Sequence, residues 1–117
     1  MRLNEIRQFD GPPIDGYGPG FFRVGGPVWR GAVLVLPTGA GAWAGLDDMP
    51  PLLDAAPGLD VLFVGTGAEI AHLPSALRAP LEEAGVGVEA MASPAAARTY
   101  NVLLAEGRRV GAALLPV

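Results

Sequence analysis

The sequence predicts one α/β domain in which helices cover a mainly parallel β-sheet, with a small antiparallel β addition near the N-terminus. The first observation is length: 117 residues is the usual size of a single domain, so residues 1–117 are taken as one unit. The second is composition, because 50% hydrophobic and 17% charged residues allow a core to be buried. The third is an alternation of apolar runs with helical patterns from residue 32 onward.

The first thirty residues predict only short strands, because Gly and Pro interrupt them repeatedly. Apolar pieces at 21–24 and 28–29 flank Gly25, Gly26 and Pro27. A Gly-Gly-Pro sequence between two apolar pieces is typical of a hairpin-like turn. We therefore expect a small antiparallel element ahead of the main sheet.

Three continuous apolar runs predict the buried strands of the main sheet. They are residues 32–36, residues 60–65 and the shorter run 86–91, which contains Glu89. Continuous rather than alternating hydrophobicity is typical of a strand buried on both faces. A further run at 110–115 predicts a last strand.

Helical patterns separate these runs. Residues 48–56 predict a short helix capped by Asp48, and residues 75–84 predict a second helix that ends at Gly85. Pro80 weakens the second helix unless it lies in the first turn, because proline has no amide proton. The chain therefore follows a β–α–β–α–β order through this region.

The third helix, after the third buried strand, has the clearest start and end. Ser93 is a favoured N-cap, Pro94 suits the first helical position, and Gly107 suits a left-handed residue after the last turn. Right-handed β–α–β connections would then place the three buried strands parallel in one sheet. The patterns leave the direction of the last strand open.

Charge and residue usage exclude several classes of function. The net charge is −4 and all eight cations are arginines that form no basic tract, which argues against nucleic acid as a partner. The chain has no cysteine, so disulfides, thiolate nucleophiles, iron–sulfur clusters and cysteine zinc sites are excluded. No apolar stretch is long and uninterrupted enough to predict a membrane span or a signal peptide. We expect a soluble, cytoplasmic protein without membrane insertion, metal or cofactor.

The loops after the buried strands are the candidate functional site. In an open parallel sheet, ligands bind beyond the carboxyl ends of the strands, and backbone N–H groups in such loops can hold an anion. The candidate ligand cleft comprises Thr38, Trp43, Gly65, Thr66, Gly67, Ser93, Tyr100 and Asn101. The alternative is that the glycines only make tight turns and that Ser93 only caps a helix.

Two residues of that set, Tyr100 and Asn101, allow two interpretations. Their Thr-Tyr-Asn run lowers helix propensity relative to Ala or Leu, so a specific role is expected. Either a buried hydroxyl and an amide tie the helix to a loop, or the two side chains form the polar floor of a pocket. The sequence does not separate these two accounts.

Familiar catalytic patterns are absent. The Gly-Thr-Gly sequence at 65–67 lacks the third glycine and the immediate helix of a dinucleotide-binding fingerprint, and no lysine is present to complete a P-loop. His72 is the only histidine, and its spacing from Ser75 does not make a catalytic triad. We expect His72 to be polar surface in a loop.

Ordered blocks of the sequence are similar to one known family. The blocks are residues 17–23, residues 31–37 followed by Trp43, residues 64–67, 77–78 and 85–86, and residues 99–103 with 105–108. The chain resembles a family of small domains of unknown function that includes the mitochondrial NADH:ubiquinone oxidoreductase (complex I) assembly factor 3 and the adipogenesis-associated Mth-type domain protein, with many bacterial members. This resemblance extends from about residue 14 to the last residue.

The resemblance implies a three-layer fold whose central mixed sheet has mainly parallel strands and one antiparallel strand, which we expect to be the last. The sequence departs from the family at residues 92–94, where relatives often carry a Thr- and Gly-containing turn, and this weakens an anion site there. The mitochondrial members look like assembly helpers, so the resemblance implies little about catalytic chemistry.

Two functional hypotheses follow. The first, which the residues favour, is a non-enzymatic interaction or assembly-factor-like protein with a protein partner and an exposed apolar patch rimmed by arginine. The second is a small-molecule or anion-binding domain, including a hydrolase, that uses the candidate ligand cleft. A homo-oligomer is compatible with either, and the sequence identifies neither partner nor ligand.

Overall fold

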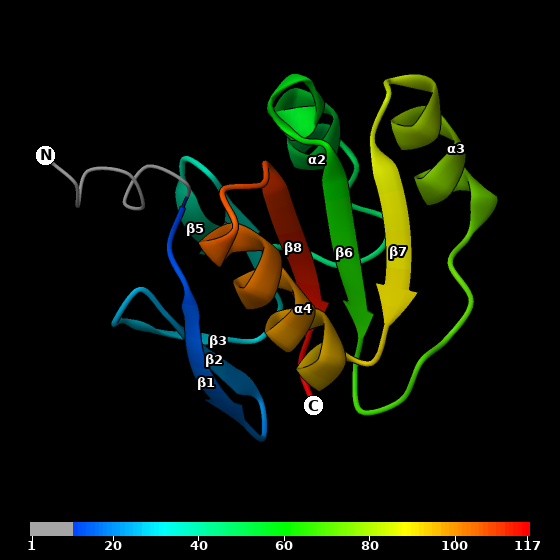
Figure 1. The fold of residues 1–117 in the computed structure, drawn as a ribbon. Helices are drawn as coiled ribbons and strands as arrows, with labels where there is room; N and C mark the ends of the chain where they lie inside the picture. Colours follow the sequence, from blue (N-terminus) through cyan, green and yellow to red (C-terminus); the bar gives the residue numbers. More distant parts are fainter. Residues whose placement is uncertain (1–10) are drawn as a thin grey trace, which may run out of the picture.

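Two β-sheets carry the fold, and the computed structural model describes residues 11–117 of the chain. The smaller sheet is antiparallel, with the order β1-β2-β3, and the larger has the order β5-β4-β8-β6-β7 (Figure 1). The strands are Ile14–Gly18 (β1), Phe21–Val24 (β2), Val28–Arg30 (β3), Val33–Leu36 (β4), Gly39–Ala42 (β5), Val61–Thr66 (β6), Gly87–Met91 (β7) and Val110–Leu115 (β8).

Within residues 11–117, three helices pack on the larger sheet, and each face of the sheet has its own hydrophobic core. Helices α2 (Pro50–Ala55, extended by the 3-10 turn Ala56–Gly58) and α3 (Ser75–Glu83) share one core with one face. Helix α4 (Ser93–Ala105) and the smaller sheet share the other core with the opposite face (Figure 1). The predicted α/β class is therefore confirmed.

The strand directions correct two expectations. β6 is parallel to both β7 and β8, whereas β4 is antiparallel to β8. The last strand is therefore parallel to its neighbour β6, and the first buried run, residues 32–36, is antiparallel to the other two. The reason is connectivity: a crossover through α4 returns β8 parallel to β7, while β4 continues directly into an antiparallel hairpin with β5.

Two strands lie in segments for which the sequence predicts loops. β5 has the sequence Gly-Ala-Gly-Ala and β1 has Ile-Asp-Gly-Tyr-Gly, so neither contains the β-branched and aromatic run that marks a strand. Both form because each pairs antiparallel with a more hydrophobic neighbour, β4 and β2 respectively. The predicted turn at 25–27 is confirmed, since β2 and β3 pair antiparallel across it.

Helix starts differ from the prediction, while the helix end at Gly107 agrees with it. Met49, not Asp48, is the N-cap of α2, and the Asp48 carboxylate accepts the Ala44 amide at 3.1 Å instead. Ser93 is the first residue of α4 and makes no capping bond there. Gly107 has a φ of 81°, the left-handed conformation expected after the last turn. Pro80 lies inside α3 without ending the helix.

Candidate functional site

The carboxyl end of β6 meets the start of α4 in a fully packed contact. Ser93 has no exposed surface, and its hydroxyl donates to the Leu115 carbonyl at 2.6 Å and accepts the Gly67 amide at 2.9 Å. The Ser93 amide donates to the Gly67 carbonyl at 2.8 Å. The Ser93 side chain therefore joins three segments of chain, which explains why it does not serve as a cap.

Gly65 is required by this contact. A Cβ at Gly65 would lie 2.6 Å from the Ser93 Oγ atom and 2.8 Å from the Cδ2 atom of Leu114. Neither atom is the free end of a flexible surface chain, so a side chain at this position would have to displace packed structure. The glycine permits the close approach of α4 to β6 and β8.

Thr66 organises the loop that follows β6. Its hydroxyl lies 2.8 Å from the Glu69 carbonyl and 3.2 Å from the Met91 carbonyl, to which it can donate, and it accepts the Ala71 amide at 2.9 Å. The polar groups of this strand end are thus paired within the protein.

Tyr100 and Asn101 attach α4 to the chain leading into β1. The Tyr100 hydroxyl donates to the Pro12 carbonyl at 2.8 Å. The Asn101 amide makes two bonds to one residue: its Oδ1 accepts the Ile14 amide at 2.9 Å, and its Nδ2 donates to the Ile14 carbonyl at 2.8 Å. Burial raises the pKa of the Tyr100 hydroxyl above its ordinary value. The interpretation in which these side chains tie the helix to another segment is confirmed.

Two other residues of the predicted cleft, Thr38 and Trp43, lie apart from the contact between residues 65–67 and Ser93. Thr38 is in the β4–β5 turn, which is at the opposite end of the sheet from Gly65 because β4 is antiparallel to β8 and therefore to β6. Trp43 is buried in the core beside α2, and its Nε1 donates to the Asp48 carbonyl at 3.2 Å. Residues 65–67 and Ser93 meet in one contact, whereas Thr38 and Trp43 do not join it.

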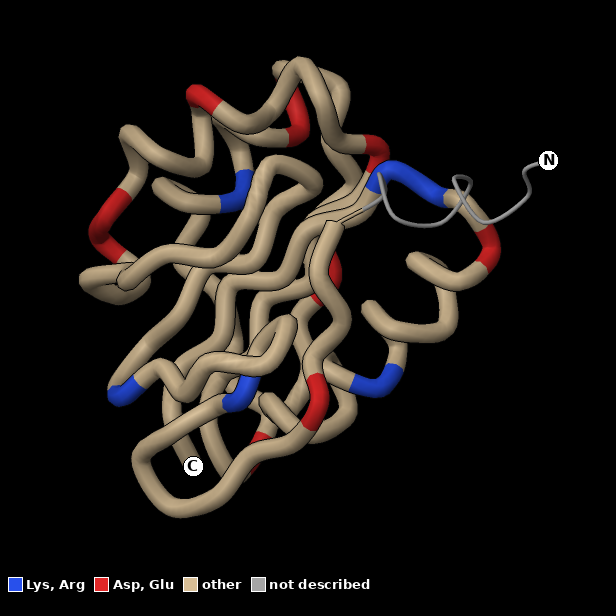
Figure 2. Tube along the Cα trace, turned by 90° about the vertical axis from the view of Figure 1, so that its left-hand side faces the viewer, with Lys and Arg blue, Asp and Glu red and all other residues tan. Residues whose placement is uncertain are grey.

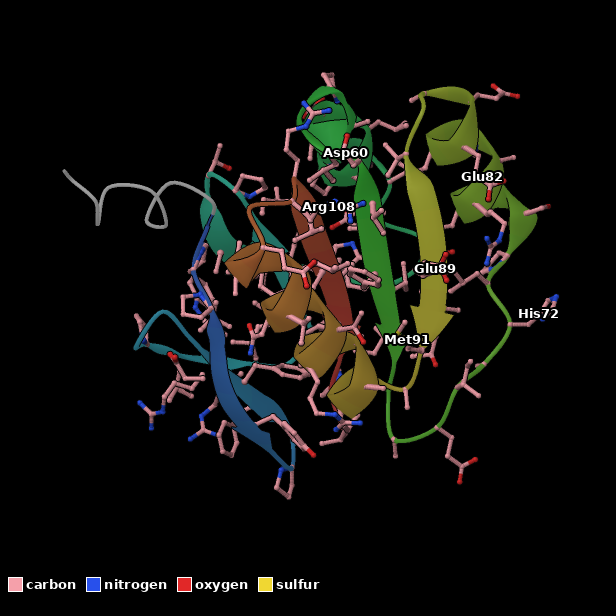
Figure 3. The ribbon with its side chains drawn as sticks, in the orientation of Figure 1. Asp60, His72, Glu82, Glu89, Met91 and Arg108 are labelled. Carbon is pink, nitrogen blue, oxygen red and sulfur yellow. The ribbon has the colours of Figure 1, made fainter. Side chains whose placement is uncertain are left out.

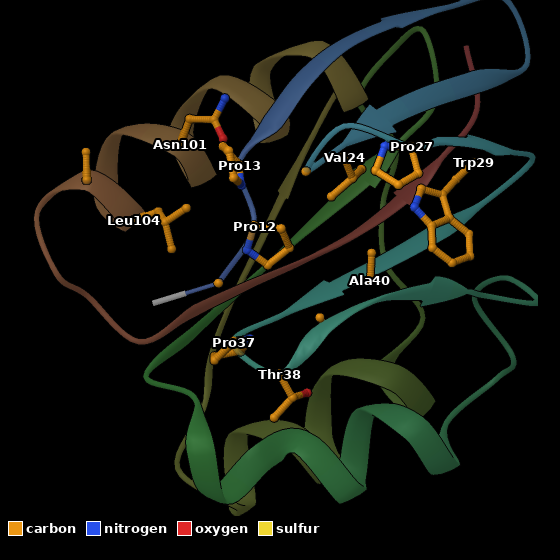
Figure 4. A pocket seen from close by; sticks show the side chains of 14 residues that line it. Pro12, Pro13, Val24, Pro27, Trp29, Pro37, Thr38, Ala40, Asn101 and Leu104 are labelled. Atoms are coloured by element: carbon orange, nitrogen blue, oxygen red, sulfur yellow. The ribbon is translucent and has the colours of Figure 1, made fainter. Parts of the chain in front are cut away.

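A groove of about 770 Å³ opens instead between the smaller sheet, the β4–β5 turn and the last turns of α4 (Figure 4). Its walls come from segments far apart in sequence. They are Gly11, Pro12, Pro13, Val24, Gly25, Pro27, Trp29, Pro37, Thr38, Gly39, Ala40, Asn101, Leu104 and Ala105. None of these lining residues carries a charged side chain, and four are prolines. The groove therefore offers mainly carbon surface and backbone groups.

Of the predicted site residues, Thr38 and Asn101 line this groove. Sequence reasoning missed Trp29 and Ala40, which also line it (Figure 4). The Nε1 of Trp29 is covered and has no hydrogen-bond partner within residues 11–117. These residues come together only in the folded chain. The one sequence feature that relates to the groove is the repeated proline in the first thirty residues, because three of the four lining prolines come from there.

No charged side chain lines the groove, but two lie at its rim: Arg23 donates to the Gly26 carbonyl at 2.9 Å, and Asp15 accepts the Gly26 amide at 2.8 Å. Seen from the side of the smaller sheet and β5, most of the trace is uncharged (Figure 2). Arg109 and Asp60 form an exposed pair at 2.7 Å, and the hydrogen bond from Arg109 holds the pKa of the Asp60 carboxyl below its ordinary value. The same pair raises the pKa of Arg109. Asp60 and Arg108 lie at one end of the sheet, and His72 points outward from the loop before α3, as expected (Figure 3).

Two further properties concern the described residues as a group. Within residues 11–117, no helix has the length and hydrophobicity needed to cross a membrane. The same residues contain no group of three or more His, Asp or Glu side chains placed to hold a metal ion.

Exposed apolar side chains occur on the smaller sheet, where Val28 is 42% exposed and lies opposite Arg23 in the register.

Comparison with known proteins finds a family whose description gives no function, and relatives that include an uncharacterised protein and an assembly factor. Residues 14–115 match the family described as "Protein of unknown function (DUF498/DUF598)". An uncharacterised protein of Rhodobacter capsulatus is 56% identical over 105 residues, covering 90% of this chain and 85% of that protein. The zebrafish (Danio rerio) NADH dehydrogenase [ubiquinone] 1 alpha subcomplex assembly factor 3 is 30% identical over 91% of this chain, which spans 65% of the length of that protein.

Solved structures share the fold. A crystal structure described as an outer membrane protein from Bartonella henselae has a TM-score of 0.84 and 38% identity, covering 94% of this chain and 99% of that one. The solution structure of a Bordetella pertussis Mth938-like domain has a TM-score of 0.76 and 34% identity, covering 99% of this chain and 92% of that one. The family resemblance drawn from the sequence blocks is confirmed.

Proposed function

Because the chain belongs to the DUF498/DUF598 family, which has no assigned function, we propose from its geometry that it is a non-enzymatic protein-binding domain whose groove holds a segment of a partner protein. The observation that carries this proposal is the groove of about 770 Å³ with its uncharged, proline-rich wall. Concave apolar surface of this kind suits hydrophobic side chains of a partner. The assembly-factor name of the zebrafish relative supports a role that depends on protein partners.

Trp29 adds a second reason to expect an occupant. Its indole N–H is covered and has no hydrogen-bond partner among the described residues 11–117, which is unusual because buried donors in native proteins are nearly always hydrogen-bonded. A partner that brings a carbonyl group to this wall would supply the missing acceptor after a small rotation of the ring. Trp is also a residue type that is enriched at the centres of protein interfaces.

The alternative function, small-molecule or anion binding at the strand ends, has less support. The amide of Gly67 and the hydroxyl of Ser93, which would have held the anion, already bond to each other. Ser93 also has no exposed surface. A small apolar molecule in the groove is the remaining form of this alternative, and it would bind without a protein partner.

Affinity isolation from the native cell tests the proposal. Ala105→Arg puts a long charged side chain on the groove wall, and Val102→Arg is the matched control, because Val102 is 57% exposed on the same helix and does not line the groove. We expect a reproducible partner with the wild type and with Val102→Arg but not with Ala105→Arg. Recovery of no partner, or equal recovery with both variants, would refute the proposal.

We also propose a cytoplasmic location, and two measurements test the location and the oligomeric state. The cytoplasmic location expected from the sequence competes with the outer membrane assigned to the Bartonella relative, and cell fractionation distinguishes them. The oligomeric state shows whether a second copy of the chain, rather than a different protein, occupies the groove. Sedimentation of the wild type and of Ala105→Arg would reveal it as a dimer that the substitution dissociates.

A further inference from the structure

We propose that the partner segment is an extended strand that pairs with the free edge of β5, with apolar side chains facing the groove and basic side chains facing Asp54. This inference rests on the proposed protein-binding function and specifies the chemistry of the partner. It is carried by three features: a backbone edge with which no other strand of residues 11–117 pairs, the position of that edge on the groove, and the charge beside it.

The first feature is the backbone edge of β5, which is the end strand of the larger sheet. The Trp43 amide donates to the Ala32 carbonyl at 3.2 Å, so this is a hydrogen-bonded pair just beyond β4 and β5. Such pairs alternate along an antiparallel ladder. Continuing the register from Ala32–Trp43 turns the N–H and C=O groups of Ala40 and Ala42 away from β4. Within residues 11–117 these four groups have no backbone partner, so they can pair with a further strand.

The opposite edge of the same sheet is different. β7 is its end strand, and the Arg78 side chain donates from Nη1 to the Val88 carbonyl at 2.9 Å. A charged side chain laid on an edge is a common means of preventing strand addition. β5 has no such protection among its own residues, since its sequence is Gly-Ala-Gly-Ala. The two edges of the sheet therefore differ in their capacity to accept a strand.

The second feature is the position of this edge on the groove. Ala40 and Ala42 pair with Val35 and Val33, whose side chains belong to the core beneath α4. The side chains of Ala40 and Ala42 therefore lie on the α4 face of the sheet, and Ala40 lines the groove (Figure 4). Partner residues opposite these two alanines would put their side chains on the same face. Apolar side chains there would enter the groove.

The third feature is the charge on the other face. A second hollow, of about 440 Å³, lies between the β4–β5 turn and α2, and Asp54 is the charged residue among those described that line it. Thr38 lines both hollows, so they lie on either side of the same hairpin end. Every second side chain of an added strand would face the α2 side, where a basic group complements the exposed Asp54 carboxylate.

The overall charge favours a different protein over a second copy. The chain carries a net charge of −4, so two copies paired through β5 repel each other. Pairing through one edge strand also places like faces on the same side, so Asp54 of α2 would lie on the same face as Asp54 of the second copy. A partner strand with alternating apolar and basic residues avoids both costs and matches the mode in which a peptide adds to a sheet edge.

Peptide titration of the full chain, followed by amide NMR signals, tests the proposal. The probe is a synthetic peptide of alternating Val and Lys, and the matched control alternates Val and Glu. We expect the Val–Lys peptide to shift the amides of Ala40 and Ala42 and to slow their hydrogen exchange, and the Val–Glu peptide to bind more weakly. Absence of these changes at millimolar Val–Lys peptide would overturn the proposal.

N-methylated probes test the backbone pairing directly. Methyl groups on the edge-facing amides remove the bonds to β5, and we expect them to weaken binding by about tenfold or more. Methyl groups on the alternate amides point away from β5 and should leave the affinity nearly unchanged. Equal effects of both methylation patterns would show that the peptide binds without strand pairing.

Two variants complete the test. Ala42→Pro removes an outward N–H while leaving the ladder to β4 intact, as proline is tolerated on an edge, so it should abolish binding in a folded protein. Asp54→Asn should weaken Val–Lys binding about two- to fivefold, and Glu83→Gln on α3 is the control that should not. If the Asp54→Asn variant binds the Val–Lys peptide as tightly as the wild type does, the basic side chains of the partner do not face Asp54, and that part of the proposal is wrong.

The outcomes separate this inference from the proposed function. If the native partner depends on the groove wall but its binding segment tolerates edge-facing N-methyl groups, strand addition is wrong and the groove proposal stands. If the Ala105→Arg variant still binds the native partner, the groove proposal is wrong, regardless of whether the peptides bind to β5.

Discussion

The Oγ atom of Ser93 lies 2.6 Å from the position that a Cβ atom on Gly65 would occupy, so these two residues can only be close together because one has no side chain. Their contact joins the end of β6 to the start of α4. The Ser93 hydroxyl then reaches the Leu115 carbonyl at the end of β8. One serine and one glycine therefore set how close α4 lies to the parallel part of the sheet.

Gly65→Ala should lower the free energy of unfolding by about 1–3 kcal/mol, because the added methyl group overpacks a site with no free volume. Chemical denaturation of both proteins measures the difference. Gly16→Ala is the control, since nothing lies within 4 Å of a Cβ at Gly16. Equal stability of the two variants would contradict the close contact with Ser93.

Ser93→Ala should also be destabilising, for a different reason. It leaves the Leu115 carbonyl and the Gly67 amide without their partner in a buried place, which costs about 1–3 kcal/mol. Ser75→Ala is the matched control, because Ser75 is exposed at the start of α3 and that helix has no side-chain cap. Amide exchange at Gly67 should accelerate only in the Ser93 variant.

Stability should fall at alkaline pH because of Tyr100. Burial raises its pKa in the folded protein above the ordinary value of 10.0, so the native state holds this proton more tightly than the unfolded state does. The stabilisation is complete below pH 10.0 and is lost as the pH rises above that value. Melting temperatures from about pH 8 to pH 11 should decline more steeply for the wild type than for Tyr100→Phe. Parallel slopes would argue against a buried hydroxyl.

The Asp60–Arg109 pair should contribute at neutral pH and lose its effect in acid. The Arg109 hydrogen bond lowers the pKa of Asp60 from 3.8, so the contribution is present above that value and disappears as the pH falls through the lower folded-state pKa. Both side chains are exposed, so the effect is small and salt weakens it. The stability difference between wild type and Asp60→Asn should vanish in acid and shrink in high salt. A difference that persists in both conditions would contradict this.

The sequence predicts the buried elements of this fold well and the weakly hydrophobic ones poorly. The runs that became β4, β6 and β8 are continuous and apolar, and their strand character follows from that alone. β5 could not be predicted, because Gly-Ala-Gly-Ala lacks any residue that favours a strand and depends on its pairing with β4. Because the sequence does not predict β5, it does not predict the β4–β5 hairpin either. It therefore predicts β4 to be parallel to β6, whereas the two strands are antiparallel.

The same error moved the candidate site. Thr38 was grouped with Gly65 on the assumption that both follow parallel strands, and the reversal of β4 separates them. Ser93 fits the pattern of an N-cap, but a local pattern carries no information about Leu115, which approaches only in the folded chain. Asn101 was identified as a residue with a specific role, yet its partner Ile14 is 87 positions away and could not be inferred.

That separation bears on how the protein is made. Of the strands described, β1–β3 leave the ribosome first, but the side chains of Tyr100 and Asn101 that hold this part of the chain in place are synthesised 88 and 87 residues after their respective partners, Pro12 and Ile14. The Gly20 amide also bonds to the carbonyl of Val117, at 3.0 Å. The apolar side chains of these early hairpins therefore stay uncovered until α4 and the segment up to Val117 have been synthesised. During that interval a chaperone has the longest access to this part of the nascent polypeptide, and slow translation of the later codons would prolong it.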